Sequence, residues 1–524
     1  MATQFLDRLP IELVNKDFAI DHWNHTVYQE VEKLVAHMLT DVSVKLFYQA
    51  INDGSMPEDR LVEMEGIVAG VNAVAERNKE GPSPVTVPKL IAVNFGFDVI
   101  TARVFSGHFL GADLKDMASS LGLSVLASDA FHAKLAALGA SPSALFREPA
   151  FCDAVGFRGE FTASGSGAYF GRSLQFSTAN TLQDVVTVIV YAPSPESNKR
   201  AVVVATAPGM VGALAGLNSD GVAMGVDTIR APNSNPEKIG LNSLLMIRST
   251  LEHATDLASA VDYVVDAHRG AAFLYPMCDA SGDCAVLESG AWLPTGTPDD
   301  PLQYVDRKLK DAGLVPDAAF IKDHPLPPNV FRNGLYVRTM NYTDADLMAP
   351  FLKFNQGLFE YAKVPYNASL FDLGQFLFPT WQADDAAEHT LRNNFFYPQQ
   401  EQEKDFITLS NFAVTPYARL NMMAPIDDDV APTGESMFWR YDMLIRNSFA
   451  NKGAIDLDKT QWIMEFLSPE RAPGYWQNRL WPHDVGSTIV EGSLTVYDLQ
   501  QRIIRSKSGY WADGWVELHL NAYL

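Results

Sequence analysis

The sequence predicts a layered α/β protein with a helical N-terminal segment. Residues 1 to about 80 show helical apolar spacing, short strand-like runs begin at residue 152, and two amphipathic helices are expected near 241–253 and 256–268. A sheet has an apolar face and an amphipathic helix an apolar stripe, and each must be buried against another element. An arrangement with helices outside and sheets stacked inside buries both of these surfaces. The length of 524 residues allows one large domain or two to three domains.

The clearest N-terminal helix follows Ser55-Met56-Pro57-Glu58, a capping-box pattern with proline in the first turn. A short apolar strand is expected at Leu90–Asn94, and residues 105–150 are less regular. The apolar residues of the helix alternate at spacings of three and four, which predicts one buried stripe: Leu61, Met64, Val68, Val71 and Ala75.

Turn-separated strands follow residue 152. Val185–Val190 is apolar on both faces, which predicts a strand that is covered on both sides. Strands also flank the turn between Cys278 and Cys284, and alternating patterns return from Ser487 to Leu524. The first four runs are Val155–Phe161, Gly167–Leu174, Asp184–Tyr191 and Ala201–Thr206.

The charge balance excludes several classes of partner. Forty Lys and Arg against 63 Asp and Glu give a net charge of −23, which repels phosphate backbones and anionic membrane surfaces. No stretch approaches the ~18 apolar residues that span a bilayer, and the N-terminus does not read as a signal peptide. We expect a soluble protein without nucleic-acid partners. The cytoplasm is favoured, and a secreted or periplasmic location stays open if a signal peptide was removed.

Three cysteines do not make a disulfide framework. Cys278 and Cys284 are expected to lie close across a hairpin, with two buried thiols favoured over a cross-strand bond. No CxxC, HExxH, Walker or G-x-S-x-G sequence is present, so we expect no metal, no cofactor and no elbow-type serine hydrolase. Cys152 remains as the candidate nucleophile.

Cys152 stands just before a glycine-punctuated hairpin that ends in Gly171-Arg172-Ser173. A cysteine attacks as its thiolate and needs a base, yet residues 152–226 contain no histidine. Cleavage immediately before the cysteine would supply an α-amine, with a reference pKa of ~7.7–8.0, as that base. The alternatives are a structural buried Cys152 and an ordinary ion-paired Arg172.

The order of several motifs resembles the cysteine-type N-terminal-nucleophile hydrolases, and the isopenicillin-N acyltransferase-like family most closely. Choloylglycine hydrolases, penicillin V acylases and N-acylethanolamine amidases are relatives of that family. The segments that carry the resemblance are Glu63–Gly70, Cys152–Ala154, Gly159 with Thr162–Gly165, Gly171–Phe176, Ala207–Gly212, Gly216–Val222, the helix at 241–264 and Val337–Tyr342.

The resemblance implies a four-layer αββα sandwich of mainly antiparallel sheets. It also implies self-cleavage between Phe151 and Cys152, although Phe151 stands where the family often has a small residue. Residues 1–151 would form a propeptide-like segment or α-subunit. Residues 152–524 would form the core, with loop insertions at about 290–335 and 350–435, and the product would be a two-chain heterodimer.

The implied site contains Cys152 as nucleophile, its α-amine as base and Arg172 as an orienting group. Asn218 and Asn341 would donate to the oxyanion, and preorganised donors of this kind stabilise it by roughly 3–4 kcal/mol each. Gln175 occupies the position where the family carries an aspartate, and it supplies no carboxylate. The alternative for Asn218 is a turn asparagine, and Asn341 also belongs to a sequon.

These residues predict an enzyme that cleaves a small N-acyl amide, or passes its acyl group to an amine, through a thioester on Cys152. Its partner would be a small-molecule N-acyl amide or acyl donor. The alternative is a non-catalytic or unprocessed protein of the same fold with a binding or regulatory role, and Gln175 motivates that alternative.

Overall fold

The structure is a computed structural model of the chain. It describes residues 14, 19, 23–81, 83–105, 110–138, 140, 145–146, 150–176, 185–229, 231, 233–292, 318–323, 331–340, 404–414, 440–441, 444–465, 491–508 and 514–523. All statements of structure below concern these residues.

One sheet has six strands, and its neighbouring strands all run antiparallel. The order is β12-β1-β2-β13-β14-β15. The strands are β1 (Ala150–Arg158), β2 (Ala168–Phe176), β12 (Phe406–Leu409), β13 (Glu491–Asp498), β14 (Ile503–Ser508) and β15 (Val516–His519).

The other sheet has nine strands and is also antiparallel, in the order β10-β11-β9-β8-β6-β5-β4-β3, with β7 paired to β8. Its strands are β3 (Thr187–Tyr191), β4 (Val202–Thr206), β5 (Ala215–Asn218), β6 (Ala223–Gly225), β7 (Asp227–Thr228), β8 (Phe273–Cys278), β9 (Cys284–Ser289), β10 (Phe331–Arg332) and β11 (Leu335–Thr339).

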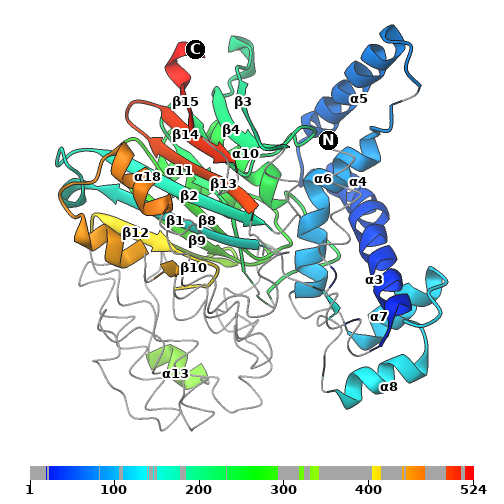
Figure 1. The fold of residues 1–524 in the computed structure, drawn as a ribbon. Coiled ribbons are helices and arrows are strands. Elements are labelled where there is room, and N and C mark those ends of the chain that lie inside the picture. The colour runs from blue at the N-terminus through cyan, green and yellow to red at the C-terminus, as the bar shows by residue number, and fades with distance from the viewer. Residues whose placement is uncertain are drawn as a thin grey trace.

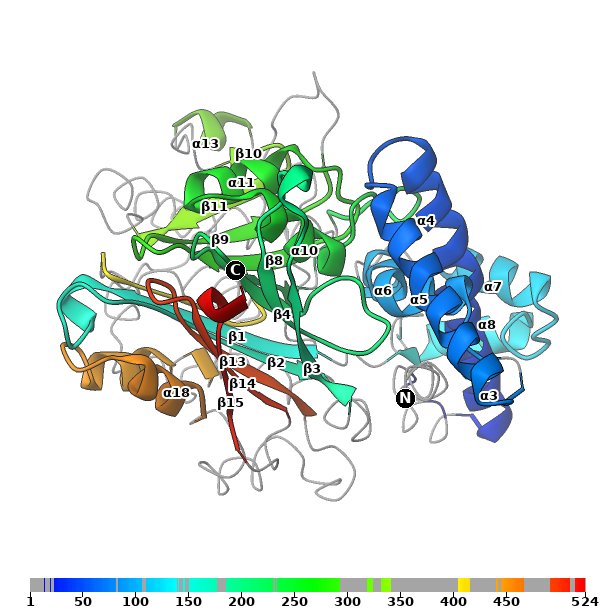
Figure 2. The ribbon, with the colours of Figure 1, turned by 90° about the horizontal axis from the view of Figure 1, so that it is seen from above.

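The two sheets stack face to face between helices (Figure 2). Helices α10 (Ser243–His253) and α11 (Leu257–Asp266) cover the nine-stranded sheet, and α18 (Leu457–Glu465) covers β2 and β13 of the six-stranded sheet. This order of layers confirms the predicted αββα sandwich. It also confirms the two helices and the hairpin that the sequence predicts between residues 241 and 289.

The N-terminal helices form a lobe beside the sandwich (Figure 1), which confirms the predicted helical segment. A short helix, α13 (Ala318–Asp323), lies apart from these helices (Figure 1). The lobe contains α3 (His25–His37), α4 (Ser43–Asn52), α5 (Asp59–Arg77), α6 (Val87–Ile100), α7 (Gly111–Ser120) and α8 (Asp129–Ala137).

Two predictions for the lobe are wrong. The expected strand at Leu90–Asn94 lies inside helix α6, and the less regular region 105–150 contains α7 and α8. Ten of the 14 residues of α6 are buried, so the helix has no polar face and shows no helical period. A short apolar run of this kind cannot be assigned to helix or strand from periodicity alone.

Two predicted burial patterns also differ from the structure. In α5 the stripe is incomplete, because Met64 and Ala75 are buried but Val71 is 37% exposed. Helix α5 starts after Glu58, which makes no side-chain cap, so the expected capping box is absent. Strand β3 was predicted to be covered on both sides, but it is a half-buried strand at the edge of its sheet.

Cys278 and Cys284 form a disulfide across the β8–β9 hairpin, which corrects the expectation of two thiols. Both residues are buried. A Cβ atom placed on Gly156 of β1 would lie 2.6 Å from the Cys284 sulfur and 2.8 Å from the Cys278 sulfur. The disulfide therefore packs directly against β1, at a position where only glycine leaves room.

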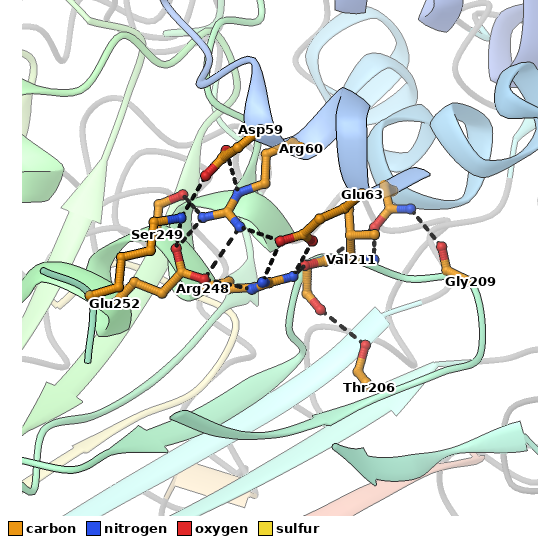
Figure 3. A network of polar contacts seen from close by, with 12 residues as sticks. Asp59, Arg60, Glu63, Thr206, Gly209, Val211, Arg248, Ser249 and Glu252 are labelled. Carbon is orange, nitrogen blue, oxygen red and sulfur yellow. Dashed lines mark hydrogen bonds and ion pairs between the residues drawn. The ribbon is translucent and has the colours of Figure 1, made fainter. Parts of the chain in front are cut away.

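A buried ion-pair network joins α5 of the lobe to α10 of the sandwich (Figure 3). Glu252 accepts from Arg60 at 2.5 Å and from Arg248 at 2.9 Å, and Arg248 also pairs with Glu63 at 2.5 Å. The side chains of Arg60, Arg248 and Glu252 are at most 4% exposed. We call these four residues the α5–α10 network.

Helix α6 makes a second polar contact between lobe and sandwich. Asp98 accepts from the backbone N–H and the hydroxyl of Ser243 at 2.7 and 2.6 Å, so it caps the N-terminus of α10. Asn94, one turn earlier, accepts from Val211 N–H and donates to Gly209 O. Burial raises the pKa of Asp98 to about 7, against the opposing hydrogen bonds from Ser243. The lobe thus completes a helix end and a loop of the sandwich.

Candidate active site

Cys152 lies on β1 with its side chain toward the nine-stranded sheet. The β1–β2 register runs without interruption from residue 150 to residue 158, so side chains alternate between the two faces. Gly156 faces the β8–β9 disulfide, and Cys152 shares that face because it lies four residues earlier. The cysteine is 1% exposed, so the structure gives the unprocessed chain a buried thiol between the sheets.

Two buried side chains bind the backbone of Cys152. Its N–H donates to Asn411 Oδ1 at 2.7 Å, and its carbonyl accepts from Arg440 Nη1 at 2.9 Å. Arg440 Nη2 donates to the same Asn411 oxygen at 2.9 Å. Asn411 Nδ2 donates in turn to the carbonyl and the hydroxyl of Thr228 on β7, at 3.0 and 3.2 Å. The nitrogen of residue 152 is therefore held by a fixed carboxamide oxygen.

Four buried charges surround this backbone: Asp153, Arg172, Asp227 and Arg440, which we call the charge cluster. Arg440 Nη1 lies 2.6 Å from Asp153 Oδ1, and Arg172 Nη2 lies 3.1 Å from Asp227 Oδ1. All four side chains are at most 1% exposed. Buried charges persist when they are paired in this way.

The pKa of Asp227 reflects the opposing effects of burial and of the other charges in the charge cluster. Burial raises the pKa of Asp227 to about 8. The positive charges of Arg172 and Arg440 oppose this rise, whereas the nearby Asp153 carboxylate adds to it. The proton on Asp227 is therefore poised near neutral pH, which is typical of functional sites.

Arg172 lies on the same face as Cys152. It pairs with Ala154 across the β1–β2 ladder, which makes it the diagonal neighbour of Cys152. Diagonal neighbours on one face are within reach of long side chains. The structure thus brings together two of the predicted site residues.

The remaining predicted residues are less fully described. The backbone of Gln175 pairs with Phe151 and Gly492, but its side chain lies outside the described part of the chain. Asn341 also lies outside the described residues. Their predicted roles stay predictions.

Asn218 does not serve the site. Both hydrogens of its Nδ2 donate to carbonyls at the end of α10, Leu251 O at 2.9 Å and Ala254 O at 2.8 Å. Its Oδ1 accepts from the N–H groups of Asp220 and Val222 in the following turn. This geometry contradicts the predicted oxyanion role, because the carboxamide points toward the outer helix and has no hydrogen left to donate. The alternative, a turn asparagine, describes Asn218 correctly.

Sequence reasoning missed three residues: Asp227, Asn411 and Arg440. Asn411 and Arg440 lie 259 and 288 positions beyond Cys152, so no local spacing links them to it. The available signal is weak, namely one or two polar residues between apolar ones, as in Leu409-Ser410-Asn411-Phe412-Ala413 or Phe438-Trp439-Arg440-Tyr441.

The fold and the site together define a class. The αββα sandwich is the architecture implied by the resemblance to N-terminal-nucleophile hydrolases, and it brings Cys152 and Arg172 together on one face of β1 and β2. Residues 179–292 match the family model described as acyl-coenzyme A:6-aminopenicillanic acid acyl-transferase. The match confirms the resemblance to this family of hydrolases and acyltransferases.

A curated relative from Archaeoglobus fulgidus, described as an uncharacterized protein, is 21% identical over 373 residues. The match covers 70% of this chain and 45% of the relative, so the chain spans less than half of that protein's length.

Three solved structures are similar at low identity. An N-acylethanolamine-hydrolyzing acid amidase ortholog from Caenorhabditis elegans is 10% identical with a TM-score of 0.32, covering 67% of this chain and 93% of its own. A conjugated bile acid hydrolase from Clostridium perfringens is 11% identical with a TM-score of 0.33, covering 70% and 93%. A penicillin V acylase from Agrobacterium tumefaciens is 11% identical with a TM-score of 0.32, covering 71% and 86%. Scores this low carry no argument about the present chain.

Within the described ranges, no helix combines the length and the apolar character needed to cross a membrane.

Proposed function

We propose that this chain is a cysteine amidohydrolase or acyltransferase that activates itself by cleavage between Phe151 and Cys152. The observation that carries the proposal is the hydrogen bond from the Cys152 nitrogen to Asn411 Oδ1 at 2.7 Å. Scission would convert that nitrogen into the α-amine, and the amine would already be hydrogen-bonded to a buried polar side chain.

Asn411 would orient the amine for its work as a base. An amine whose N–H is accepted by a carboxamide oxygen has its lone pair directed elsewhere, and the thiol of the same residue is the nearest proton source. Arg440 donates to the same oxygen at 2.9 Å and so fixes which end of the carboxamide faces Cys152. The amine then takes the thiol proton, and the thiolate becomes the nucleophile.

The reaction has two halves. The thiolate adds to the carbonyl carbon of an N-acyl amide, the C–N bond breaks, and the leaving amine takes the proton from the α-ammonium. The acyl group stays on sulfur as a thioester. Water then releases a carboxylic acid, or an amine acceptor takes the acyl group, and the thiol is restored in either case.

Self-cleavage would use the same sulfur. The thiol adds to the carbonyl carbon of Phe151, the peptide C–N bond breaks, and the acyl group moves from nitrogen to sulfur. Water hydrolyses this thioester and leaves a carboxylate on Phe151 and an amine on Cys152. The strand pairing of Phe151 with Gln175 holds the bond extended beside the thiol.

The cut would give two chains that stay together. Residues 1–151 and 152–524 share the buried Asp98 cap and the α5–α10 network, in which Arg60, Arg248 and Glu252 are buried. Breaking a buried pair costs about 3–5 kcal/mol because the partner charge is left alone. We therefore propose a processed heterodimer in which the lobe is a permanent subunit.

A second candidate is an unprocessed protein of the same fold with a binding or regulatory role. Two observations favour it: Cys152 is 1% exposed in the uncut strand, and position 175 carries glutamine. In that case Cys152 is an inert core residue.

Intact-mass measurement and N-terminal sequencing of the purified chain test the proposal. We expect a second chain that starts at Cys152, turnover of members of an N-acyl amide panel, and loss of both in Cys152→Ala. Asn411→Ala should slow both reactions about 100-fold, because the amine loses the hydrogen bond that orients it. The matched control is Cys278→Ala/Cys284→Ala, which removes the disulfide of the other two cysteines and should keep both reactions. A single chain of 57.7 kDa that turns over no amide supports the second candidate.

A further inference from the structure

The site holds a buried carboxylate that no family motif assigned. Position 175, where the resemblance calls for an aspartate, carries Gln175. Asp227 lies on β7 of the opposite sheet, is 0% exposed, and pairs with Arg172 at 3.1 Å. A carboxylate therefore reaches Arg172 from across the sandwich.

The residues beside Asp227 are shaped for this contact. Gly225 lies against the side chain of Arg172, so that a Cβ atom at position 225 would overlap the Cδ and Nε atoms of the arginine. Glycine at this place lets the arginine side chain pass directly against the end of β6 and reach Asp227. A larger residue would push Arg172 away from its partner.

The next residue links the same segment to the nucleophile. Thr228 accepts from Asn411 through both its carbonyl and its hydroxyl, and Asn411 accepts from Cys152 N–H. Residues 225–228 thus contact both groups that flank Cys152, Arg172 and Asn411. This short segment of the nine-stranded sheet therefore packs against Cys152's neighbours and fixes their positions.

We infer that Asp227 is a positioning residue for Cys152, which holds Arg172 on the nucleophile's face and supplies from β7 the carboxylate that position 175 lacks. The inference rests on the proposed function, since it assigns Asp227 a part in that same site.

The Arg172–Asp227 ion pair also leaves hydrogen-bonding groups that a substrate could use. Within the described ranges, neither oxygen of Asp227 nor any nitrogen of Arg172 has a hydrogen-bond partner that meets ordinary geometry, and the two groups meet as an ion pair. Buried polar groups without such partners are uncommon and call for an explanation. Donors of Arg172 on the face of Cys152 fit the carbonyl oxygen of an acyl group, and Asp227 holds them there while balancing their charge.

Loss of this carboxylate has a distinctive electrostatic effect. Because the pKa of Asp227 is about 8, its carboxylate neutralises the guanidinium of Arg172 mainly above that pH, which is the range in which an ordinary thiol titrates. Asp227→Asn removes this negative charge, so the positive potential at Cys152 rises in that range. A nearby positive charge lowers a thiol pKa, commonly by about 1 unit or more. The variant should therefore have a more easily ionised thiol and, because Arg172 is no longer held, slower chemistry. A purely structural role predicts neither change.

The first measurement is the pH dependence of Cys152 alkylation by iodoacetamide, located by peptide mass mapping. In Asp227→Asn we expect the midpoint to fall by about 1 pH unit, whereas Asp227→Glu, which keeps the charge, should stay near wild type. Asp98→Asn is the matched control, because Asp98 is equally buried but caps α10. An unchanged midpoint in Asp227→Asn overturns the inference.

The second measurement is the rate of self-cleavage and of turnover of the best amide from the panel. Asp227→Asn should lower kcat about 100-fold with KM within about threefold, and Gly225→Ala should do the same by displacing Arg172. Equal kcat in a folded Asp227→Asn variant refutes the inference while the proposed function stands. A wild-type chain that is neither cut nor active refutes the proposed function, and the inference with it.

Discussion

Replacement of Glu252 by glutamine should loosen the lobe from the sandwich. Glu252 accepts from Arg60 and Arg248 and lies 3.0 Å from Lys199, so its neutral isostere leaves two buried arginines without their shared anion. The shape of the side chain is kept, and only the charge is removed. The effect therefore reports the electrostatic strength of the α5–α10 network.

The structure gives the size of the effect. Burial opposes ionisation of Glu252, but hydrogen bonding and charge from Arg60, followed by Arg248 and Lys199, lower its pKa from 4.5 to about 2. At ~1.4 kcal/mol per pKa unit, the ionised form stabilises the fold by about 3 kcal/mol. A depressed pKa gives stability that is fully present above about pH 4.5 and is lost as the pH falls through about 2.

Urea unfolding at pH 7 and at pH 3 measures this prediction, with Glu65→Gln as the control because Glu65 is an exposed residue of α5. We expect Glu252→Gln to lose about 3 kcal/mol at pH 7 and less at pH 3, and the control to lose almost nothing. If the protein is processed, the two chains of the variant should also separate more readily in size-exclusion chromatography. A loss below about 1 kcal/mol at pH 7, the range of a surface ion pair, would refute the reasoning.

Two further substitutions test other contacts. Gly156→Ala places a Cβ atom 2.6 Å from the Cys284 sulfur and should lower the unfolding free energy by about 1–3 kcal/mol in urea. Most of that loss should disappear in a Cys278→Ala/Cys284→Ala background, and an undiminished loss there would contradict the contact. Asp98 has a pKa of about 7, raised by burial, so its contribution to stability is complete below about pH 4 and is lost as the pH rises through about 7. Asp98→Asn should therefore flatten the fall in stability between pH 4 and 8, although Asp227 contributes a fall of the same sign, and an identical pH profile would argue against a buried, protonated Asp98.

Elements with a clear period or a marked turn were predictable from the sequence. The β8–β9 hairpin follows from the Cys278–Cys284 turn, and α11 follows from Asp256, which accepts from Ser259 N–H as an N-cap should. Helix α6 was missed because it is buried on nearly every side, and such a helix carries no amphipathic signal. The exposure of β3 was missed because a strand's apolar residues do not say whether it lies at an edge.

The candidate site was predictable in part. Cys152 and Arg172 lie 20 positions apart on adjacent strands, so one motif contains both. Asp227 reaches the site because the two sheets stack, Asn411 because it follows β12, which pairs with β1, and Arg440 from a segment outside both sheets. Residues that meet through tertiary packing leave no spacing in the sequence. Asn218 was misassigned for the converse reason, since a glycine-flanked asparagine reads the same in a turn as in an oxyanion hole.

The cap that Asp98 places on α10 has a consequence for production of the protein. Helix α10 spans the face of the nine-stranded sheet, and its first turn receives its acceptor from a different part of the chain. If residues 152–524 were made alone, helix α10 would have to form without Asp98 at its N-terminus. The 209–212 loop would also lack its contact with Asn94. We therefore expect residues 152–524 to fold poorly without the lobe, and recombinant work on the larger piece should co-express residues 1–151 with it.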